Sequence, residues 1–523
     1  MLITLNNPHL QHHVGEKQAR KKKLALVLRG IVHSHSYLFL QQQTMSLLYF
    51  DSLPTNRLAT ENEGPQLIVP PNILALILIH TVQRNLFDFS NPARSFSEAS
   101  RIGRVCRAWR HVSLATPELW ATMALCLDSR GWNPAVLERL QVHLDRSMDA
   151  RLRISVESED GLQDKRPLFP FMKDLDRIFS LKIQTRAHVD FGKVAQQYIG
   201  RASNILVHSP EGIIGLTLDK TKHVQSAVLI PSATFFSHAE LGRFTWILPS
   251  VHLTHLHLKC YPQSAMTMLR DCHNLIHGHF ILPPYGFIDA EPAIFVSQRA
   301  PSNYIVRALE TLIIEVVNAS RPGRDYPFPS LAHLFNTITT PSLYTLALLS
   351  DANQNPYSIY PSPSAEFLTA LINLIYRSLA RIQNAEIIGV PIAAYDLVPL
   401  FKSLRWVKSV TLGEAKGSKN KIVTTGLLGL LTSSALPYTV LLPELQQLQL
   451  QIHDLGWAQG AFEAMLDVRS RRGLHSVLVV LNSERELLRS RIDMGHLRGL
   501  QRDGLAIRLI THQLNTGRVI LGY

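Results

Sequence analysis

The residues of this 523-residue chain best suited to chemistry are histidines and cysteines gathered in one short segment. Imidazole nitrogens and thiolate sulfurs are ligands that zinc prefers, and a structural zinc site needs four of them at fixed geometry. The group consists of His252, His255, His257, Cys260, Cys272, His273, His277 and His279. Its spacing matches no zinc module. We therefore expect no metal here, and we expect histidines that face solvent or a partner.

Other catalytic patterns are absent from the sequence. It contains no glycine-rich phosphate loop, no nucleophile elbow and no His-Glu-x-x-His zinc motif. The sequence therefore predicts a protein that is not an enzyme, with no catalytic residues, no metal and no cofactor. A hydrolase or metal-dependent enzyme hidden in the C-terminal region is the alternative that this reasoning leaves open.

An apolar segment near residue 70 predicts the first helix. Pro71 suits the first helical position, because proline lacks the N–H that would have no partner there. Ile73 and Ile77 then stack at i,i+4, as do Leu74 and Leu78. A short helix that is apolar on most sides must be covered on most sides.

A second apolar segment predicts a helix that starts at a capping box, Ser95-Phe96-Ser97-Glu98. Five residues at helical spacing form one apolar stripe on it: Ile102, Val105, Cys106, Trp109 and Val112. Thr116-Pro117 is expected to cap and start a third helix or turn, which Leu119-Trp120 closes. So small a unit has more apolar surface than it can bury, which indicates a partner protein. The alternative is that the stripe is only the core of a small helical domain.

Three blocks of this region resemble an F-box, in the form found in fungal F-box proteins. The family start is Leu-Pro-x-Glu-Leu/Ile-Leu, its centre Val-Cys-(Arg/Lys)-x-Trp-Arg and its end Thr-Pro-x-Leu-Trp. The matching blocks are Val69-Pro70-Pro71-Asn72-Ile73-Leu74, Val105-Cys106-Arg107-Ala108-Trp109-Arg110 and Thr116-Pro117-Glu118-Leu119-Trp120. Asn72 departs from the pattern, since an acid is usual there. The resemblance covers roughly a tenth of the chain.

The resemblance implies a three-helix domain over residues 66–122 that binds a Skp-type adaptor and, through it, a cullin. It implies an adaptor-binding surface that consists of Pro70, Pro71, Ile73, Leu74, Ile77, Val105, Cys106, Trp109, Leu119 and Trp120. The arginines between these positions are expected to face solvent.

The region after Trp120 predicts short strands that alternate with short helices. Residues 123–127 and 152–156 read as strands, and Asn133-Pro134 opens a helix between them. Strand, helix and strand in this order favour a parallel pair with a crossover.

A Leu-x-x-Leu-x-Leu pattern then recurs along the chain. Its copies, strict and loose, occupy residues 253–258, 309–314, 343–348, 407–412, 445–450 and 474–479. Alternate residues of a strand point to opposite faces, so the leucines enter the core and the intervening residues face outward. The pattern predicts an irregular, degenerate leucine-rich-repeat-like α/β solenoid with a parallel sheet over residues 123–515.

The intervening positions are the ones expected to face a target protein. They are Thr254, His255, His257, Glu310, Thr311, Lys408, Ser409, Gln446, Gln447 and Gln449. An F-box followed by such repeats resembles a common architecture of fungal F-box proteins.

Composition narrows the class of protein. With 46% hydrophobic and 18% charged residues the chain is globular. Four cysteines over this length do not describe a disulfide framework, and they suit a reducing compartment, which favours the cytoplasm, the nucleus or both. No uninterrupted apolar stretch approaches membrane-spanning length, so no membrane is expected.

A net charge of +13 raises nucleic acid as a partner. Acids are interspersed among the basic residues and no nucleic-acid-binding motif accompanies them, so an acidic protein target is at least as compatible. A basic run at 17–23 lies in the segment 1–63, which is expected to be a flexible N-terminal segment, with a nuclear address as the alternative. Residues 516–523 are expected to be a C-terminal tail.

Together these features predict an α/β protein with a three-helix F-box followed by an irregular repeat region. The expected function is that of a substrate-recognition adaptor of an SCF-type ubiquitin ligase, which binds a Skp-type adaptor and an unidentified protein target. Three alternatives stay open: an F-box scaffold without a role in ubiquitination, a nucleic-acid-binding protein and a metal-dependent protein.

Overall fold

The computed structural model describes most of the chain between residues 70 and 521. The described residues are 70–85, 102–127, 134–158, 174, 176–185, 189–190, 202–209, 213–214, 224–231, 251–260, 262–282, 303–317, 328–350, 365–390, 392–414, 421–432, 440–452, 458, 460–481, 492–513 and 516–521. All of them belong to one compact unit, Val69–Tyr523. The predicted N-terminal segment 1–63 and the predicted capping box Ser95-Phe96-Ser97-Glu98 lie outside them.

Three helices open this unit. They are α3 (Pro71–Asn85), α5 (Arg107–Leu114) and α6 (Pro117–Trp120). Pro71 and Pro117 stand at the starts of their helices, as the sequence predicts. Thr116 is the N-cap of α6, but its hydroxyl donates to the carbonyl of Val112 (2.7 Å) and not to α6. Thr116 therefore ties the end of α5 to the start of α6.

The second predicted helix is interrupted. Ile102 is helical, a turn follows, and α5 begins only at Arg107. Cys106 is the N-cap, with an extended backbone (φ −157°, ψ 172°) and a sulfur that accepts a hydrogen bond from the N–H of Trp109 (3.5 Å). Because a cap residue lies outside the helical dihedrals, Val105 and Cys106 do not continue the helical stripe. The prediction of one unbroken helical face over these residues is wrong.

The rest of the unit is α/β and contains one large sheet. Its fifteen strands, in spatial order, are β1 (Thr122–Leu127), β2 (Leu152–Ser158), β3 (Ile178–Thr185), β5 (Asn204–Ser209), β7 (Ser226–Pro231), β8 (His255–Lys259), β9 (His277–Leu282), β11 (Thr311–Val316), β13 (Thr345–Ser350), β14 (Asn384–Ile388), β15 (Ser409–Gly413), β16 (Gln447–Ile452), β17 (Ser476–Leu481), β18 (Ala506–Gln513) and β19 (Thr516–Leu521). Two short parallel pairs stand apart: β4 (Val189–Asp190) with β6 (Ile213–Ile214), and β10 (Tyr304–Ile305) with β12 (Ile338–Thr339).

Spatial order in the large sheet equals chain order, and every neighbouring pair is parallel except β18 with β19. The predicted parallel sheet is therefore confirmed. Strand β19 pairs antiparallel with β18 and lies within the segment expected to be a C-terminal tail.

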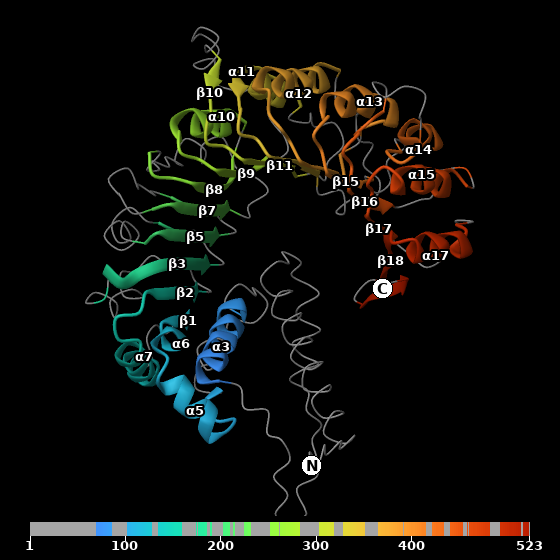
Figure 1. Cartoon of the computed structure of the whole chain (residues 1–523). Helices are drawn as coiled ribbons and strands as arrows, with labels where there is room; N and C mark the ends of the chain where they lie inside the picture. The colour runs from blue at the N-terminus through green and yellow to red at the C-terminus, as the bar shows by residue number, and fades with distance from the viewer. Residues whose placement is uncertain are drawn as a thin grey trace, which may run out of the picture. The chain divides into compact units, whose positions relative to one another are not determined.

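Helices connect the strands along one side of the sheet. They are α7 (Pro134–Arg146), α10 (Pro262–Asp271), α11 (Phe328–Thr337), α12 (Ala365–Ser378), α13 (Ala394–Ser403), α14 (Thr425–Thr432), α15 (Ala461–Ser470) and α17 (Met494–Arg502). Within this unit the sheet curves, the helices from α10 onward lie on its outer side and the strands line its inner side (Figure 1). We call the face turned away from these helices the open face.

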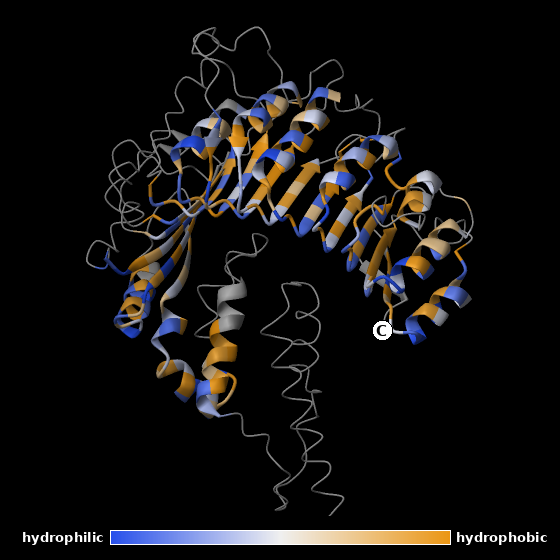
Figure 2. Ribbon diagram, turned by 45° about the horizontal axis from the view of Figure 1, so that its top comes forward, coloured by the Kyte–Doolittle hydropathy of each residue, from blue (hydrophilic) through white to orange (hydrophobic). Residues whose placement is uncertain are grey.

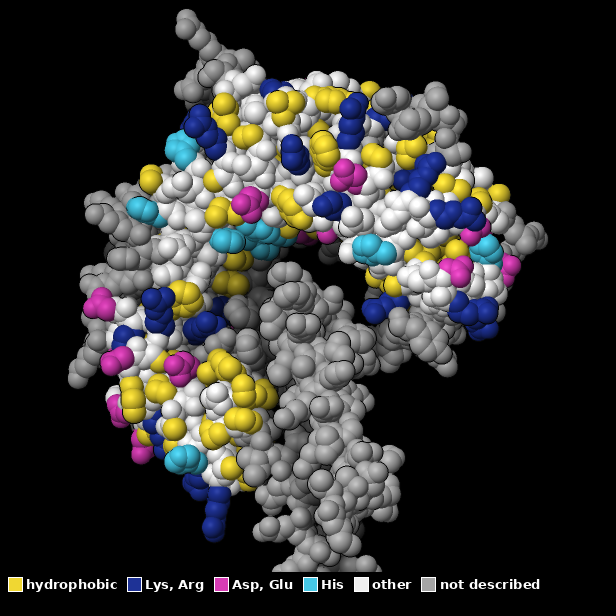
Figure 3. All heavy atoms as spheres, viewed as in Figure 1, with side chains coloured by type: hydrophobic (Ala, Val, Ile, Leu, Met, Phe, Trp, Pro, Cys, Tyr) yellow, Lys and Arg dark blue, Asp and Glu magenta, His cyan; other side chains and the backbone are white. Residues whose placement is uncertain are grey.

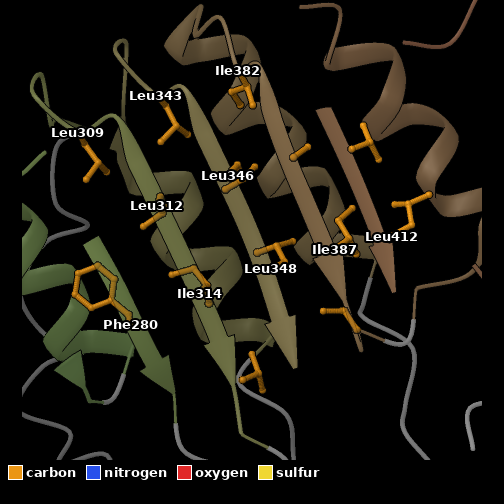
Figure 4. Packing of buried hydrophobic residues seen from close by; sticks show 14 of the residues in the cluster. Phe280, Leu309, Leu312, Ile314, Leu343, Leu346, Leu348, Ile382, Ile387 and Leu412 are labelled. Carbon is orange, nitrogen blue, oxygen red and sulfur yellow. The ribbon is translucent and has the colours of Figure 1, made fainter. Parts of the chain in front are cut away.

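The leucines of the recurring pattern form the core between the sheet and the helices. In the copy at 309–314, Leu309 precedes the strand while Leu312 and Ile314 lie on it, and all three are fully buried. The parallel register places Leu312 beside Leu346 and Ile314 beside Leu348, so the side chains form rows across the strands (Figure 4). Hydrophobic residues recur along the strands across the sheet, with more hydrophilic positions between them, and the helices also carry residues of both kinds (Figure 2).

Two arginines join neighbouring helices through backbone carbonyls. Arg377 on α12 donates to the carbonyl of Phe335 in the last turn of α11 and to that of Ile338, the first residue of β12. Arg469 on α15 donates to the carbonyl of Leu431 on α14 (2.7 Å) and to two carbonyls in the turn before β16. Carbonyls at helix ends have no partner within the helix, so these guanidinium groups supply it. None of the described helices is long and apolar enough to span a lipid bilayer.

Candidate functional site

The helices α3, α5 and α6 pack around a small core of their own. It consists of Leu74, Leu78, Ile102, Val112, Leu119 and Trp120, with Ala75, Ile79 and Trp109 partly buried against it. This core leaves other apolar residues of these helices, and of the turn before α5, in solvent. Val105 is 62% exposed, Leu76 54%, Leu114 46% and Ile77 39%. Hydrophobic side chains gather over α3 in the lower part of Figure 3.

The structure divides the predicted adaptor-binding residues into three groups. Pro70, Pro71, Ile77, Val105 and Cys106 are exposed. Ile73 and Trp109 are partly buried. Leu74, Leu119 and Trp120 are buried, at 8%, 0% and 2% exposure. The first group and part of the second can touch a partner directly, whereas the buried side chains act through the fold of the unit.

Trp120 links the helices α3, α5 and α6 to α7, which follows the first strand of the sheet. Its Nε1 donates to the carbonyl of Ser113 at the end of α5 (2.7 Å). Its ring meets His143 of α7 edge-on at 4.9 Å, and the Arg146 guanidinium lies 4.4 Å from the ring centre. Burial lowers the pKa of His143 to about 4, so this imidazole is neutral at pH 7. Trp120 therefore serves as a structural link, a role that only its surroundings reveal.

We call the exposed residues Pro70, Pro71, Leu76, Ile77 and Val105 the apolar helical surface. Leu76 was not among the residues predicted for this surface, although its exposure exceeds that of Ile77. On a helix that is apolar nearly all the way round, sequence alone does not say which side the fold covers.

A second candidate surface is the open face of the sheet. From β3 to β17 the first open-face position of each successive strand holds a polar residue, and the register places these residues side by side in one row. The row consists of Ser180, Asn204, Ser226, His255, His277, Thr311, Thr345, Asn384, Ser409, Gln447 and Ser476. Polar side chains held on a rigid sheet can donate and accept hydrogen bonds to a bound polypeptide.

The residues predicted to face a target fall into two sets. His255, Thr311, Ser409 and Gln447 lie in this row, and His257 and Gln449 lie in the next row of the same face. The other four, Thr254, Glu310, Lys408 and Gln446, lie in the turns that precede their strands. The other row members were not named among the residues predicted to face a target. Thr345 and Ser476 lie within copies of the leucine pattern, whereas Ser180, Asn204, Ser226, His277 and Asn384 lie on strands without such a copy.

Four histidines meet on the open face at β8 and β9. His257 and His279 stack at 3.9 Å between ring centres, and His255 and His277 at 5.9 Å. Nε2 of His279 lies 3.1 Å from a carboxylate oxygen of Glu315 on β11. We call these four histidines, with Lys259 and Glu315, the histidine cluster, and Figure 3 shows histidine side chains gathered on the inner side of the curve.

Burial and the nearby imidazoles lower the pKa of two of the four histidines. Burial, helped by the nearby His279, lowers the pKa of His257 to about 4, and burial with the nearby His255 lowers the pKa of His277. Burial also lowers the pKa of Lys259. The hydrogen bond from His279 lowers the pKa of Glu315, which therefore stays ionised at pH 7.

The neighbouring cysteines do not join the histidines. Burial raises the pKa of the Cys260 thiol, and it raises the pKa of the Cys272 thiol to about 12, so both are protonated at pH 7. His252 and His273 are exposed in turns. Across the described residues, no three His, Cys, Asp or Glu side chains lie so that they could hold a metal ion.

No model of a known protein family matches this chain, and no curated protein matches it either.

Proposed function

We propose that this protein is a non-enzymatic substrate-recognition adaptor of an SCF-type ubiquitin ligase. The helices α3, α5 and α6 form an F-box-like domain that binds a Skp-type adaptor. The sheet is the framework of a leucine-rich-repeat-like solenoid whose open face holds a protein target. Such a protein works by bringing the target close to the ubiquitin-charged enzyme, which needs no covalent chemistry from this chain.

The exposure of Val105 carries the first half of the proposal. Val105 is 62% exposed in the turn before the N-cap of α5, so most of its side chain is not used to fill the core of this unit. Ile77 and Leu76 on α3 are also exposed, although the same helix buries Leu74 and Leu78 in the small core. One side of α3 therefore serves the fold, and the other is available to a partner polypeptide.

The second half of the proposal, that the sheet holds a protein target, is supported by the polar row of the open face. Core leucines on one face and polar residues on the other are what a sheet needs if it is to bind a partner without losing its own core. The proposed location is the cytoplasm, the nucleus or both, where such ligases act.

Co-purification from cells tests the adaptor contact. The variant Ile77→Asp, Val105→Asp places two charges on the apolar helical surface. Its matched control is Val142→Asp, Val251→Asp, because Val142 on α7 and Val251 in the turn before β8 are 39% and 60% exposed. We expect recovery of the Skp-type adaptor to fall at least about tenfold in the first variant, since each buried charge costs more than 1 kcal/mol, and to stay unchanged in the control.

Equal recovery of adaptor by the two variants contradicts the proposal, provided that circular dichroism shows both folded. Loss of recovery in both shows a general effect of added charge, which also contradicts it. Whether ubiquitination follows is tested by deletion of the protein: a bound target whose abundance rises supports the ligase role, and one whose abundance is unchanged favours a scaffold.

A further inference from the structure

A group of exposed side chains lies at the edge of the sheet where strands β14 and β15 begin. It consists of Leu379, Arg381, Arg405, Trp406 and Lys408, in the turns that lead from α12 into β14 and from α13 into β15. We call this group the turn surface. Backbone hydrogen bonds join the two turns, since the N–H groups of Lys408 and Ser409 both donate to the carbonyl of Gln383 (2.9 Å). The framework of the sheet therefore holds the turn surface in place.

Leu379 is exposed in a backbone conformation that is costly for a leucine. Its side chain is 86% exposed, and its φ of 51° lies in the left-handed region that favours glycine. Where the chain enters this region after α15 and α17, the residues are Gly473 and Gly504. Leu379 thus adds little to the core and is disfavoured by its own backbone. A strained and exposed apolar residue of this kind points to a binding surface.

Trp406 adds an aromatic side chain that the fold uses only in part. It is 46% exposed, and the guanidinium of Arg381 lies 5.3 Å from its ring centre. No described residue accepts a hydrogen bond from its Nε1. Tryptophan and arginine are among the residues that contribute most to binding at protein interfaces. Leu379 and Trp406 are therefore suited to anchor a partner polypeptide.

The three cations of the turn surface are not paired with carboxylates. Arg405 is exposed and Lys408 partly exposed, and among the described residues neither has an ion pair or a side-chain hydrogen bond. Arg381 is exposed, and within the same residues its guanidinium contacts only the ring of Trp406. All three lie beyond the last helical turns of α12 and α13, where the helix dipole would favour a cation. Their charges are thus available to a partner.

Carboxylates are fewer than cations along this edge. The described turns that lead into β14, β15, β16 and β17 hold one carboxylate, Glu444, and five cations: Arg381, Arg405, Lys408, Arg471 and Arg472. The turns before β11 and β18 add Arg307, Glu310 and Asp503, and Glu386 lies on the open face of β14. Lys and Arg side chains recur over the part of this unit from α12 to α17 (Figure 3). The turn surface therefore favours an anionic partner.

We propose that the turn surface binds a segment of a partner protein in which carboxylates stand next to an apolar side chain. The apolar side chain packs on Leu379 and Trp406, and the carboxylates accept hydrogen bonds from Arg405 and Lys408. Leu379 favours a polypeptide over a nucleic acid, because bases stack on aromatic rings and guanidinium groups and gain little from a leucine. The inference goes beyond the proposed function, since this surface is separate from the open face and from the apolar helical surface.

Fluorescence anisotropy with the full chain tests this. The probe is a labelled peptide that repeats Leu-Glu-Glu, and two control peptides repeat Leu-Gln-Gln and Gly-Glu-Glu. At about 50 mM salt we expect the Kd of the probe to be at least about tenfold lower than that of either control, because each control lacks one of the two kinds of contact. Added salt should raise the Kd of the probe. Equal binding of either control peptide, or no binding of the probe, overturns the proposal.

The variant Leu379→Gly separates binding from folding. Glycine suits a φ of 51°, so the variant should unfold at the temperature of the wild type or higher, while its Kd for the probe rises at least about fivefold. The matched control is Met148→Gly, because Met148, in the turn after α7, is 63% exposed with a φ of 43°. This control should bind the probe as the wild type does. Unchanged binding by Leu379→Gly overturns the proposal.

The variant Arg405→Glu, Lys408→Glu tests the cations. We expect its Kd for the probe to rise at least about tenfold at low salt and less at high salt. The control Arg139→Glu, Arg498→Glu changes the net charge equally at exposed positions on α7 and α17 and should bind nearly as the wild type does. Circular dichroism shows whether each variant is folded, and Arg405→Gln, Lys408→Gln replaces a variant that is not. Equal losses in variant and control overturn the proposal.

Single-stranded oligouridylate tests for a nucleic-acid partner. Displacement of the probe by oligouridylate at lower concentration than by the unlabelled peptide overturns the proposal. The outcome is separate from that of the adaptor contact, because the variant Ile77→Asp, Val105→Asp should bind the probe as the wild type does. If that variant also recovers the adaptor normally from cells, the proposed function fails while this inference stands.

Discussion

At the scale of single residues, Arg469 shows how the fold depends on a charge that it buries. Its side chain is 1% exposed and donates to the carbonyls of Leu431, Leu441 and Leu442. Burial lowers the pKa of its guanidinium to about 10, which leaves it fully protonated at pH 7. Three carbonyls from a helix end and a turn thus share one donor group, which fixes the path of the chain into β16.

Replacement of this arginine by a hydrophobic residue of similar length should be costly. In Arg469→Met the three carbonyls stay buried without a donor, so we expect the free energy of unfolding to fall by about 3 kcal/mol. Urea denaturation followed by circular dichroism measures it. The control is Arg471→Met, two residues along the chain, where the side chain is exposed and the expected change is within about 0.5 kcal/mol. Equal effects in the two variants would contradict the role assigned to Arg469.

At the scale of elements, the neighbouring strands β14 and β15 come close together at Gly413, a residue without a side chain. A Cβ on Gly413 of β15 would lie 2.8 Å from Cγ2 of Ile388 and 3.2 Å from its Cα, on the adjacent strand β14. The end of this strand pair can close only because no side chain stands there. On α14, by contrast, a Cβ on Gly429 would meet nothing within 4 Å.

These two glycines predict opposite effects of one substitution. Gly413→Ala should destabilise the protein by about 1–3 kcal/mol, since the backbone of β14 must move. Gly429→Ala should stabilise it by roughly 0.5–1 kcal/mol, because glycine within a helix costs conformational entropy. Thermal unfolding of both variants measures the difference. A stabilised Gly413→Ala would show that the two strands do not approach as closely as described.

At the scale of the whole molecule, the order of strands along the chain sets how stability is distributed. Because each strand of the large sheet pairs with its neighbours in sequence, no strand depends on a partner from a distant part of the chain. Stability is then close to a sum over successive strand and helix units, each stabilised by the next.

Removal of the last units should therefore leave the others folded. A chain that ends after Leu481 lacks α17, β18 and β19, and Glu463 loses the N–H of Asp493 that its carboxylate accepts (2.9 Å). We expect a lower urea midpoint but a cooperative transition, with the helical circular dichroism of the remaining described helices retained. Loss of all cooperative unfolding would show that the sheet is stable only when its C-terminal strands are present.

Much of this architecture could be predicted from local patterns. Leu312 and Ile314 on their strand, and Leu309 before it, are buried as the recurring pattern predicts, because alternation along a strand is a local property. The start of α3 at Pro71 and that of α6 at Pro117 follow from the missing N–H of proline. The alternation of these strands and the two helix starts at proline were thus determined by the sequence itself, whereas the start of α5 at Arg107 was not.

The tertiary structure alone decided which side chains stay available to a partner. Trp120 and Val105 belong to two of the three blocks that resemble an F-box, yet α5 and α7 contact the tryptophan while a turn leaves the valine in solvent. The meeting of His257 with His279 needs two strands joined by a helix to align in register. Burial and register arise from contacts between residues far apart in the chain, and a local pattern carries no information about those contacts.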